Sequence, residues 1–220
     1  MHPYLLSAEN AFSKKTNPAN AAAAKAYLRN QFDFFGLKTD LRREITKSLF
    51  KKELPGAEEI PNILRQAWEH PMREMQYFAI ELAACYKKEW PEEMIVHFEK
   101  MILGKSWWDS VDAIASQLTG PYFKRYPEQV IPVTSVWNKS GDIWLQRSSL
   151  IFQLLYKKET DTTLLKKYIL QLRKSDEFFV QKAIGWVLRQ YARTNPEWVK
   201  MFVEQTQLPA LSRREALKHF

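Results

Sequence analysis

A repeat of about 35 residues constrains the fold of this chain more than any other feature of its sequence. Four segments, which begin at Ser106, Gly141, Asp176 and Ser212, align at intervals of 35, 35 and 36 residues. Each begins with a helix-capping residue or a glycine, and the first three then carry paired apolar residues. A weaker copy begins at Pro71. A fixed period of this length is typical of stacked helix pairs, and we interpret the repeated segment as the second helix of each pair.

Composition and punctuation favour helices throughout. The 220 residues include only 6 glycines, and segments of about 10–18 residues show helical periodicity. The segment nearest to a strand, residues 129–134, contains a proline that argues against a central strand. We therefore predict an all-α fold, a curved α-solenoid of HEAT-like helix-pair repeats, forming a single domain over residues 1–220. The breaks between helices are expected at Asn17-Pro18, Leu54-Pro55-Gly56, His70-Pro71, Trp90-Pro91, Gly120-Pro121, Ser140-Gly141, Asn195-Pro196 and Leu208-Pro209.

The charge of the chain is unevenly distributed. Residues 1–120 carry 16 basic and 16 acidic residues, whereas residues 121–220 carry 17 and 9, so the whole net charge of +8 lies in the second half. A one-sided basic balance favours a polyanionic partner, nucleic acid before membrane, although charge that only keeps the protein in solution gives the same composition.

The N-terminal segment and the single cysteine bear on the subcellular location of the protein. We expect no signal peptide, because no charged segment followed by an apolar stretch opens the sequence, and no run approaches the roughly 18 apolar residues of a membrane span. Cys85 lies in an apolar run and is expected in the core. One cysteine allows no disulfide within the chain, which fits a reducing compartment, and we expect a cytoplasmic protein.

The sixth position after each repeat start carries a charge. Equivalent positions of stacked repeats form a ladder on one face, and the second helices usually line the concave, ligand-binding side. Aromatic rings accompany these charges at helical spacing, so we expect three consecutive repeats to project a ring beside a charge toward one groove. The ladder residues are Asp112, Arg147, Lys182 and Lys218, and the accompanying rings are Trp108, Trp144 and Trp186, the last with Arg189 on the same face.

The pair of Trp108 and Asp112 is the sharpest chemical signal. A carboxylate beside an indole face suits a developing cation, such as the oxocarbenium-like sugar formed when a glycosidic bond is hydrolysed. The alternative is a core tryptophan beside a solvated aspartate. Trp186 follows Gly185, and a small residue beside a large ring either lets a ligand approach or serves helix packing.

Several basic residues of the second half are candidates for contacts with nucleic-acid phosphates, with solvated surface charge as the alternative for each. A second basic run, from Lys38 to Lys52, is either another phosphate-binding helix or a solvated face. None of the four histidines has the spacing of a zinc site, and no nucleotide-binding or hydrolase glycine motif occurs, so we expect no metal and no cofactor. The candidate phosphate ligands are Arg147, Lys182, Arg189, Arg193, Arg213, Arg214 and Lys218.

Four blocks of sequence, in this order and spacing, resemble the AlkD-like family of HEAT-repeat DNA glycosylases. The resemblance covers essentially the whole chain, more weakly through Asn17-Pro18 and residues 34–37. The blocks are residues 105–112 (KSWWDSVD), 143–147 (IWLQR), 177–189 (EFFVQKAIGWVLR) and 211–216 (LSRREA).

The resemblance implies a monofunctional glycosylase that removes cationic alkylated purines, such as 3-methyladenine and 7-methylguanine, from double-stranded DNA. It implies that Asp112 is the catalytic carboxylate, that Trp108 and Trp186 frame the deoxyribose of the lesion, and that Arg147 holds a backbone phosphate. It also implies contact with the backbone without a pocket that encloses the base, so neutral lesions should be poor substrates.

One position departs from the family pattern. Lys38 stands where the resemblance implies a glutamine, and we expect it to contact DNA, where it would either strengthen phosphate binding or disfavour a nearby cation. We expect a monomer with no membrane partner. The alternatives are a non-catalytic DNA-binding HEAT-repeat protein and a solenoid that binds only proteins.

Overall fold

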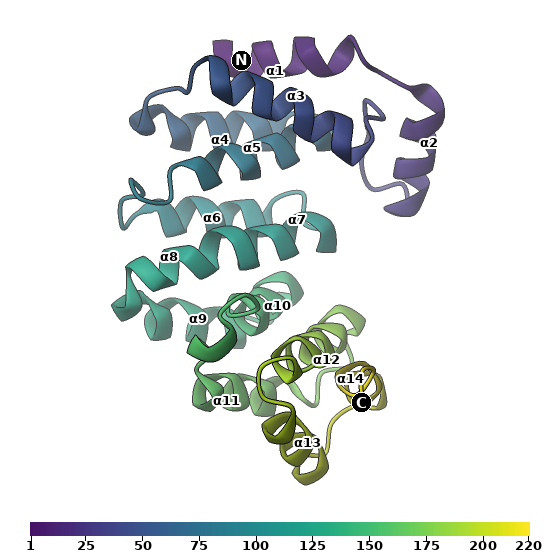
Figure 1. The fold of residues 1–220 in the computed structure, drawn as a ribbon, viewed down its shortest axis with the longest axis vertical. Coiled ribbons are helices and arrows are strands. Elements are labelled where there is room, and N and C mark those ends of the chain that lie inside the picture. The colour runs from purple at the N-terminus through teal and green to yellow at the C-terminus, as the bar shows by residue number, and fades with distance from the viewer. The chain divides into compact units, whose positions relative to one another are not determined.

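The computed structural model describes residues 1–220, and its regular structure is entirely helical (Figure 1). An isolated bridge between Asp33 and Met72 is the only β-type pairing. The predicted all-α fold is therefore confirmed. The α-helices are α1 (Pro3–Ser13), α2 (Pro18–Tyr27), α3 (Thr39–Lys52), α4 (Ile60–Glu69), α5 (Arg73–Cys85), α6 (Met94–Leu103), α7 (Trp108–Ala113), α8 (Gly120–Arg125), α9 (Val130–Lys139), α10 (Ile143–Ile151), α11 (Thr162–Leu172), α12 (Phe178–Ala192), α13 (Pro196–Gln205) and α14 (Ala210–Ala216).

Shorter helices connect some of these elements. Three are 3₁₀-helices, η1 (Ala57–Glu59), η3 (Pro127–Gln129) and η4 (Lys157–Glu159). The fourth, η2 (Ile114–Thr119), is a π-helix that joins α7 to α8 without interruption. None of the helices is both long and apolar enough to cross a membrane.

The spacing of the second helices follows the sequence repeat. Helices α5, α7, α10 and α12 begin at residues 73, 108, 143 and 178, so each begins 35 residues after the one before. The last, α14, begins at residue 210, directly after the N-cap residue Pro209 and two residues before the aligned segment. Side chains of Asp142, Asp161 and Asn195 cap α10, α11 and α13 by accepting backbone hydrogen bonds.

The chain divides into two compact units, residues 1–97 and 98–220. In the first unit, α1, α3, α4 and α5 pack around a core that includes Leu5, Phe12, Ile60 and Phe78. The loop before α3 is fixed by Glu74, whose buried carboxylate accepts hydrogen bonds from the backbone N–H groups of residues 35, 36 and 37. A single domain over residues 1–220 stays a prediction.

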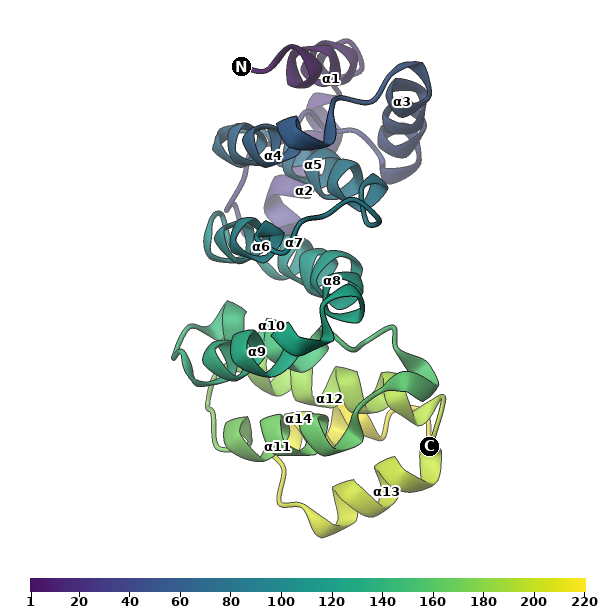
Figure 2. The same cartoon turned by 90° about the vertical axis from the view of Figure 1, so that its left-hand side faces the viewer.

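In the second unit, helix pairs α9–α10, α11–α12 and α13–α14 follow one another along the chain, and α14 packs along α12 (Figure 2). The interior of this unit contains Phe123, Trp137, Phe152 and Tyr168.

Two expectations for individual residues are wrong. Gly120-Pro121 does not end a helix, because η2 widens the turn there and the N–H of Gly120 donates to the carbonyl of Ala115, five residues earlier. A π turn accommodates a proline that would clash in a regular α-helix. Cys85 is exposed and not in the core, since it is the last residue of α5 and lies where the helix ends.

Candidate active site

Asp112 lies in the last turn of α7, immediately before the π-helix η2. Single π turns inside α-helices occur frequently at functional sites. The hydroxyl of Ser116, within η2, donates to the backbone carbonyl of Asp112 at 2.6 Å. A side chain of the same continuous helix therefore fixes the backbone at Asp112, and the contacts of its carboxylate come from another helix.

Arg147 of α10 holds that carboxylate in a bidentate ion pair. Its Nε donates to Oδ1 of Asp112 at 2.6 Å and its Nη2 donates to Oδ2 at 2.8 Å. Its Nη1 donates to the backbone carbonyl of Phe179 at 2.7 Å, at the start of α12. Arg147 is only 5% exposed, whereas the side chain of Asp112 keeps 16% of its surface accessible. Three successive second helices thus meet at one guanidinium.

The protonation of Asp112 reflects this setting. Burial raises the pKa of the carboxyl above its ordinary value, and the charge of Asp109 adds to the rise. The hydrogen bonds and the positive charge of Arg147 act in the opposite direction. A carboxylate in this position is more basic than one in water, which suits a group that faces a cation or takes up a proton.

The two tryptophans expected beside Asp112 are half-buried. Trp108 begins α7 and stands one helical turn before Asp112. The ring of Trp186, on α12, lies over the guanidinium of Arg147, 5.7 Å from ring centre to the central carbon. Arg147 therefore connects two of the sequence-predicted catalytic residues, Asp112 of α7 and Trp186 of α12.

The expectation that each repeat projects a ring into a groove is wrong for Trp144. This residue is 8% exposed and packs against Trp107 and Phe179, with ring centres 5.8 and 4.8 Å away. Trp107 and Phe179 also contact each other at 5.4 Å. Trp107 lies just before α7 with an extended backbone and packs in this aromatic cluster, whereas Trp108 is the first residue of the helix, and both residues are half-buried.

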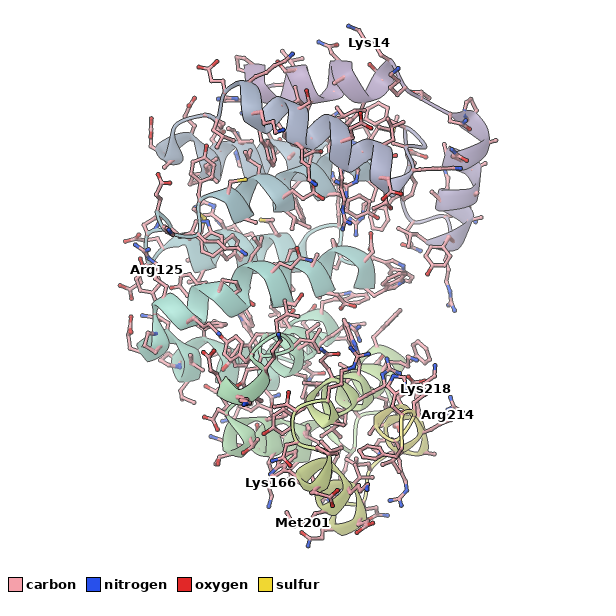
Figure 3. The ribbon with its side chains drawn as sticks, in the orientation of Figure 1. Lys14, Arg125, Lys166, Met201, Arg214 and Lys218 are labelled. Atoms are coloured by element: carbon pink, nitrogen blue, oxygen red, sulfur yellow. The ribbon has the colours of Figure 1, made fainter.

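Of the cations of α12 and α14 that are predicted to bind DNA, some form ion pairs within the protein and others are exposed. Lys182 and Arg189 of α12 both pair with Glu215 of α14, at 3.0 and 2.7 Å. Arg213, Arg214 and Lys218 are exposed. Arg213 donates to the backbone carbonyl of Val203 at 3.0 Å, whereas Arg214 on α14 and Lys218 just after it form no ion pair and project outward in Figure 3.

Lys38 belongs to the first unit. It is exposed and caps the N-terminus of α3 with its backbone. Arg193, the remaining candidate, is exposed at the C-terminal end of α12. The roles of all these residues in DNA binding stay predictions.

Two contacts of the predicted site residues have no signal in the sequence. Phe179 acts on Arg147 through its backbone carbonyl, which any residue would provide. Glu215 looks like one more surface acid of a basic segment, yet it joins two predicted DNA ligands. The only hint of it is Gly185, which marks a close approach and faces α14.

The arrangement provides a fixed, partly accessible carboxylate, a buried guanidinium and two large rings. It can stabilise a positive charge and accept a proton, which are the requirements of glycosidic bond hydrolysis. No group of three or more His, Cys, Asp or Glu side chains is placed to hold a metal ion.

Known proteins similar to this chain agree in their descriptions. A family model described as "DNA alkylation repair enzyme" matches residues 8–220. A solved structure titled as a predicted DNA alkylation repair enzyme from Enterococcus faecalis is 34% identical, with a TM-score of 0.86, over 93% of this chain and 96% of that one. No curated protein sequence matches.

More distant structures share the fold. AlkD2 from Streptococcus mutans is 16% identical with a TM-score of 0.65, over 89% of this chain and 98% of that one. The protein smu.31 from Streptococcus mutans UA159 is 15% identical with a TM-score of 0.62, over 81% and 91%. The family match extends over nearly the whole chain, so the chain belongs to the DNA alkylation repair enzyme family.

Proposed function

We propose that this protein is a monofunctional DNA glycosylase that hydrolyses the N-glycosidic bond of cationic alkylated purines in duplex DNA. The substrates are 3-methyladenine and 7-methylguanine, and the base is not enclosed in a pocket. The observation that carries the proposal is the carboxylate of Asp112, which Arg147 fixes in one orientation while part of its surface stays accessible.

The reaction follows from the charges. The bond between C1′ of deoxyribose and the purine nitrogen breaks, and its electron pair goes to the base, which leaves neutral because it was cationic. The sugar becomes an oxocarbenium-like cation, stabilised by the carboxylate of Asp112 and by the faces of Trp108 and Trp186. Water then adds to C1′, and its proton passes to Asp112 or to solvent.

This scheme predicts the choice of substrate. The site supplies opposite charge but no recognition of the base edge, so the leaving group must already be activated by its own positive charge. Neutral lesions should be released slowly. Arg147, Lys182, Arg189, Arg213, Arg214, Lys218 and Lys38 are the residues we propose to bind the DNA backbone, with the protein acting as a monomer in the bacterial cytoplasm.

A non-catalytic DNA-binding role is the second candidate. It is favoured by the fact that both carboxylate oxygens of Asp112 accept hydrogen bonds from Arg147, as in a purely structural ion pair. The two candidates differ in what loss of the carboxylate does to excision when binding is intact.

The deciding experiment measures release of free methylated purine from a 7-methylguanine duplex under single-turnover conditions. The wild type, Asp112→Asn and the control Asp176→Asn, an exposed aspartate of the same unit, are compared. We expect release by the wild type and the control, none by Asp112→Asn, and duplex affinity of Asp112→Asn equal or higher. No borohydride-trapped complex should form, because no lysine has a covalent role. Wild-type binding without release would support the non-catalytic candidate.

A further inference from the structure

Glu215 lies between two cations of the neighbouring helix. Its Oε1 is 3.0 Å from Nζ of Lys182, and its Oε2 accepts a hydrogen bond from Nη1 of Arg189 at 2.7 Å. Lys182 and Arg189 are seven residues apart on α12, so a single carboxylate of α14 spans two turns of that helix. The side chain of Glu215 is only 12% exposed, less than either of its partners.

Gly185 makes this position possible. It lies on α12 between the two cations, and a Cβ added there would be 2.4 Å from Cβ of Glu215 and 2.8 Å from the carbonyl oxygen of Ser212. The hydroxyl of Ser212 in turn donates to the carbonyl of Gln181 at 2.8 Å. The two helices therefore touch at a glycine, and their contact places Glu215 directly over it.

The three charges are strongly coupled. The hydrogen bond from Lys182 is the main cause that lowers the pKa of Glu215, and the charges of Lys182 and Arg189 lower it further against the effect of burial. Glu215 is thus an anion at neutral pH. Lys182 and Arg189 are therefore each paired with an anion of the protein, whereas the exposed cations Arg214 and Lys218 form no ion pair.

We propose that Glu215 is a positioning residue that acts as an internal counter-ion, which orients Lys182 and Arg189 and limits their contribution to the affinity for undamaged duplex. The proposal rests on the proposed DNA-binding function. A cation whose charge Glu215 already offsets neutralises a DNA phosphate less completely, so fewer of the counterions condensed on the DNA are released, and the phosphate must also compete with Glu215. The same pairing holds both cations beside Trp186, at a fixed distance from the Asp112 site.

Such a counter-ion lets the affinity for undamaged duplex decrease while the rate of the chemical step is maintained, although in a basic groove without it the two would change together. Weaker binding to ordinary duplex lets the protein leave undamaged DNA sooner. Fixed cations keep the backbone in one place relative to Asp112 once a lesion is bound, which supports the chemical step. A purely structural role for Glu215 would predict no such separation.

The test compares Glu215→Gln with Glu204→Gln, which removes the same charge from an exposed position of α13 that has no ion-pair partner. Binding to an undamaged duplex is measured by fluorescence anisotropy over a salt series, and excision under single-turnover, saturating conditions. For Glu215→Gln we expect several-fold tighter binding at low salt and a log–log salt slope steeper by about 1, one phosphate contact's worth. We also expect a several-fold slower excision step. Glu204→Gln should match the wild type.

A slope for Glu215→Gln equal to that of the wild type, or equal changes in both variants, overturns the proposal. Thermal denaturation checks folding, and Glu215→Asp, which keeps the charge, should restore the wild-type slope even where Glu215→Gln is unstable. A wild type that binds no duplex overturns the proposed function and this inference together. A wild type that binds and excises, with an unchanged Glu215→Gln, overturns the inference alone.

Discussion

Asp112 on α7 and Arg147 on α10 form a bidentate ion pair, with hydrogen bonds of 2.6 and 2.8 Å, between positions 35 residues apart in the sequence. The two residues occupy the same place in consecutive repeats. The geometry of the proposed catalytic carboxylate is therefore set by the next repeat along the chain, and variants of either residue should reveal the coupling.

Arg147→Met should destabilise the fold. It leaves the buried carboxylate of Asp112 without its counter-ion, and removal of one partner of a buried pair costs about 3–5 kcal/mol. Urea denaturation measures the change in the free energy of unfolding. The double variant Asp112→Asn/Arg147→Met, in which no charge is left unpaired, should regain part of this loss. A double variant whose loss equals the sum of the single losses would contradict the coupling.

Arg147→Lys should move the acid limb of the excision rate to higher pH. Excision needs the deprotonated Asp112, whose pKa burial raises and Arg147 lowers. Lysine keeps a positive charge but cannot form the two parallel hydrogen bonds, so the protonated carboxyl becomes more favourable. Single-turnover rates over a pH series follow the titration, and the acid limb of the wild type should already lie above the ordinary aspartate value of about 3.9, because burial outweighs Arg147. An acid limb that stays in place or moves to lower pH would refute this reading of the ion pair.

Arg214→Gln and Lys182→Gln should differ in their effect on duplex binding. Arg214 is exposed and unpaired, so its loss should reduce the log–log salt slope by about 0.9. Lys182 is already paired with Glu215, so its loss should reduce the slope by clearly less. Anisotropy titrations at several salt concentrations measure both. Both variants should act alike on duplexes of different sequence, because phosphate contacts do not read bases.

Glu74→Gln should weaken the first unit. The buried carboxylate accepts three backbone hydrogen bonds from the loop before α3. Hydrogen bonds to a charged group contribute about 1.5–3 kcal/mol each, and a glutamine retains only part of this, so we expect a loss of roughly 3 kcal/mol. Thermal or urea unfolding measures it. Glu44→Gln, at an exposed position of α3, should change stability by no more than about 0.5 kcal/mol.

The sequence predicts the helices well because their signals are local or periodic. The 35-residue interval predicts the spacing of α7, α10 and α12, each of which begins two residues after its aligned segment, and the weaker copy at Pro71 also lies two residues before the start of α5. Of these four helices only α10 is capped by a side chain, that of Asp142, so the expected capping residues at the segment starts are not the caps of α7 and α12. The pairing of Asp112 with Arg147 is also consistent with the ladder, since equivalent positions of stacked repeats are neighbours.

What the sequence does not predict depends on side-chain direction and on distant contacts. The repeat pattern predicts that Trp144 faces a groove with Arg147, yet both residues are buried, Trp144 in an aromatic cluster with residues of neighbouring segments. Glu215 is 33 residues beyond Lys182 and outside the ladder register, so no period connects them. Pro121 looks like a helix end because a sequence pattern does not reveal a widened turn.

That widened turn gives the long helix from Trp108 to Arg125 two different phases. One extra residue in a turn advances the direction of every later side chain by about 100°. Ahead of it, Asp112 is directed to Arg147; behind it, Gly120 is turned so closely onto α10 that a Cβ would lie 2.5 Å from the carbonyl oxygen of Phe152. The hydroxyl of Tyr156 stabilises this second contact by donating a hydrogen bond to the carbonyl of Gly120 at 2.6 Å. The widened turn therefore lets one helix direct Asp112 to Arg147 and Gly120 to Phe152, and deletion of one residue between 114 and 119 would break one of these two contacts.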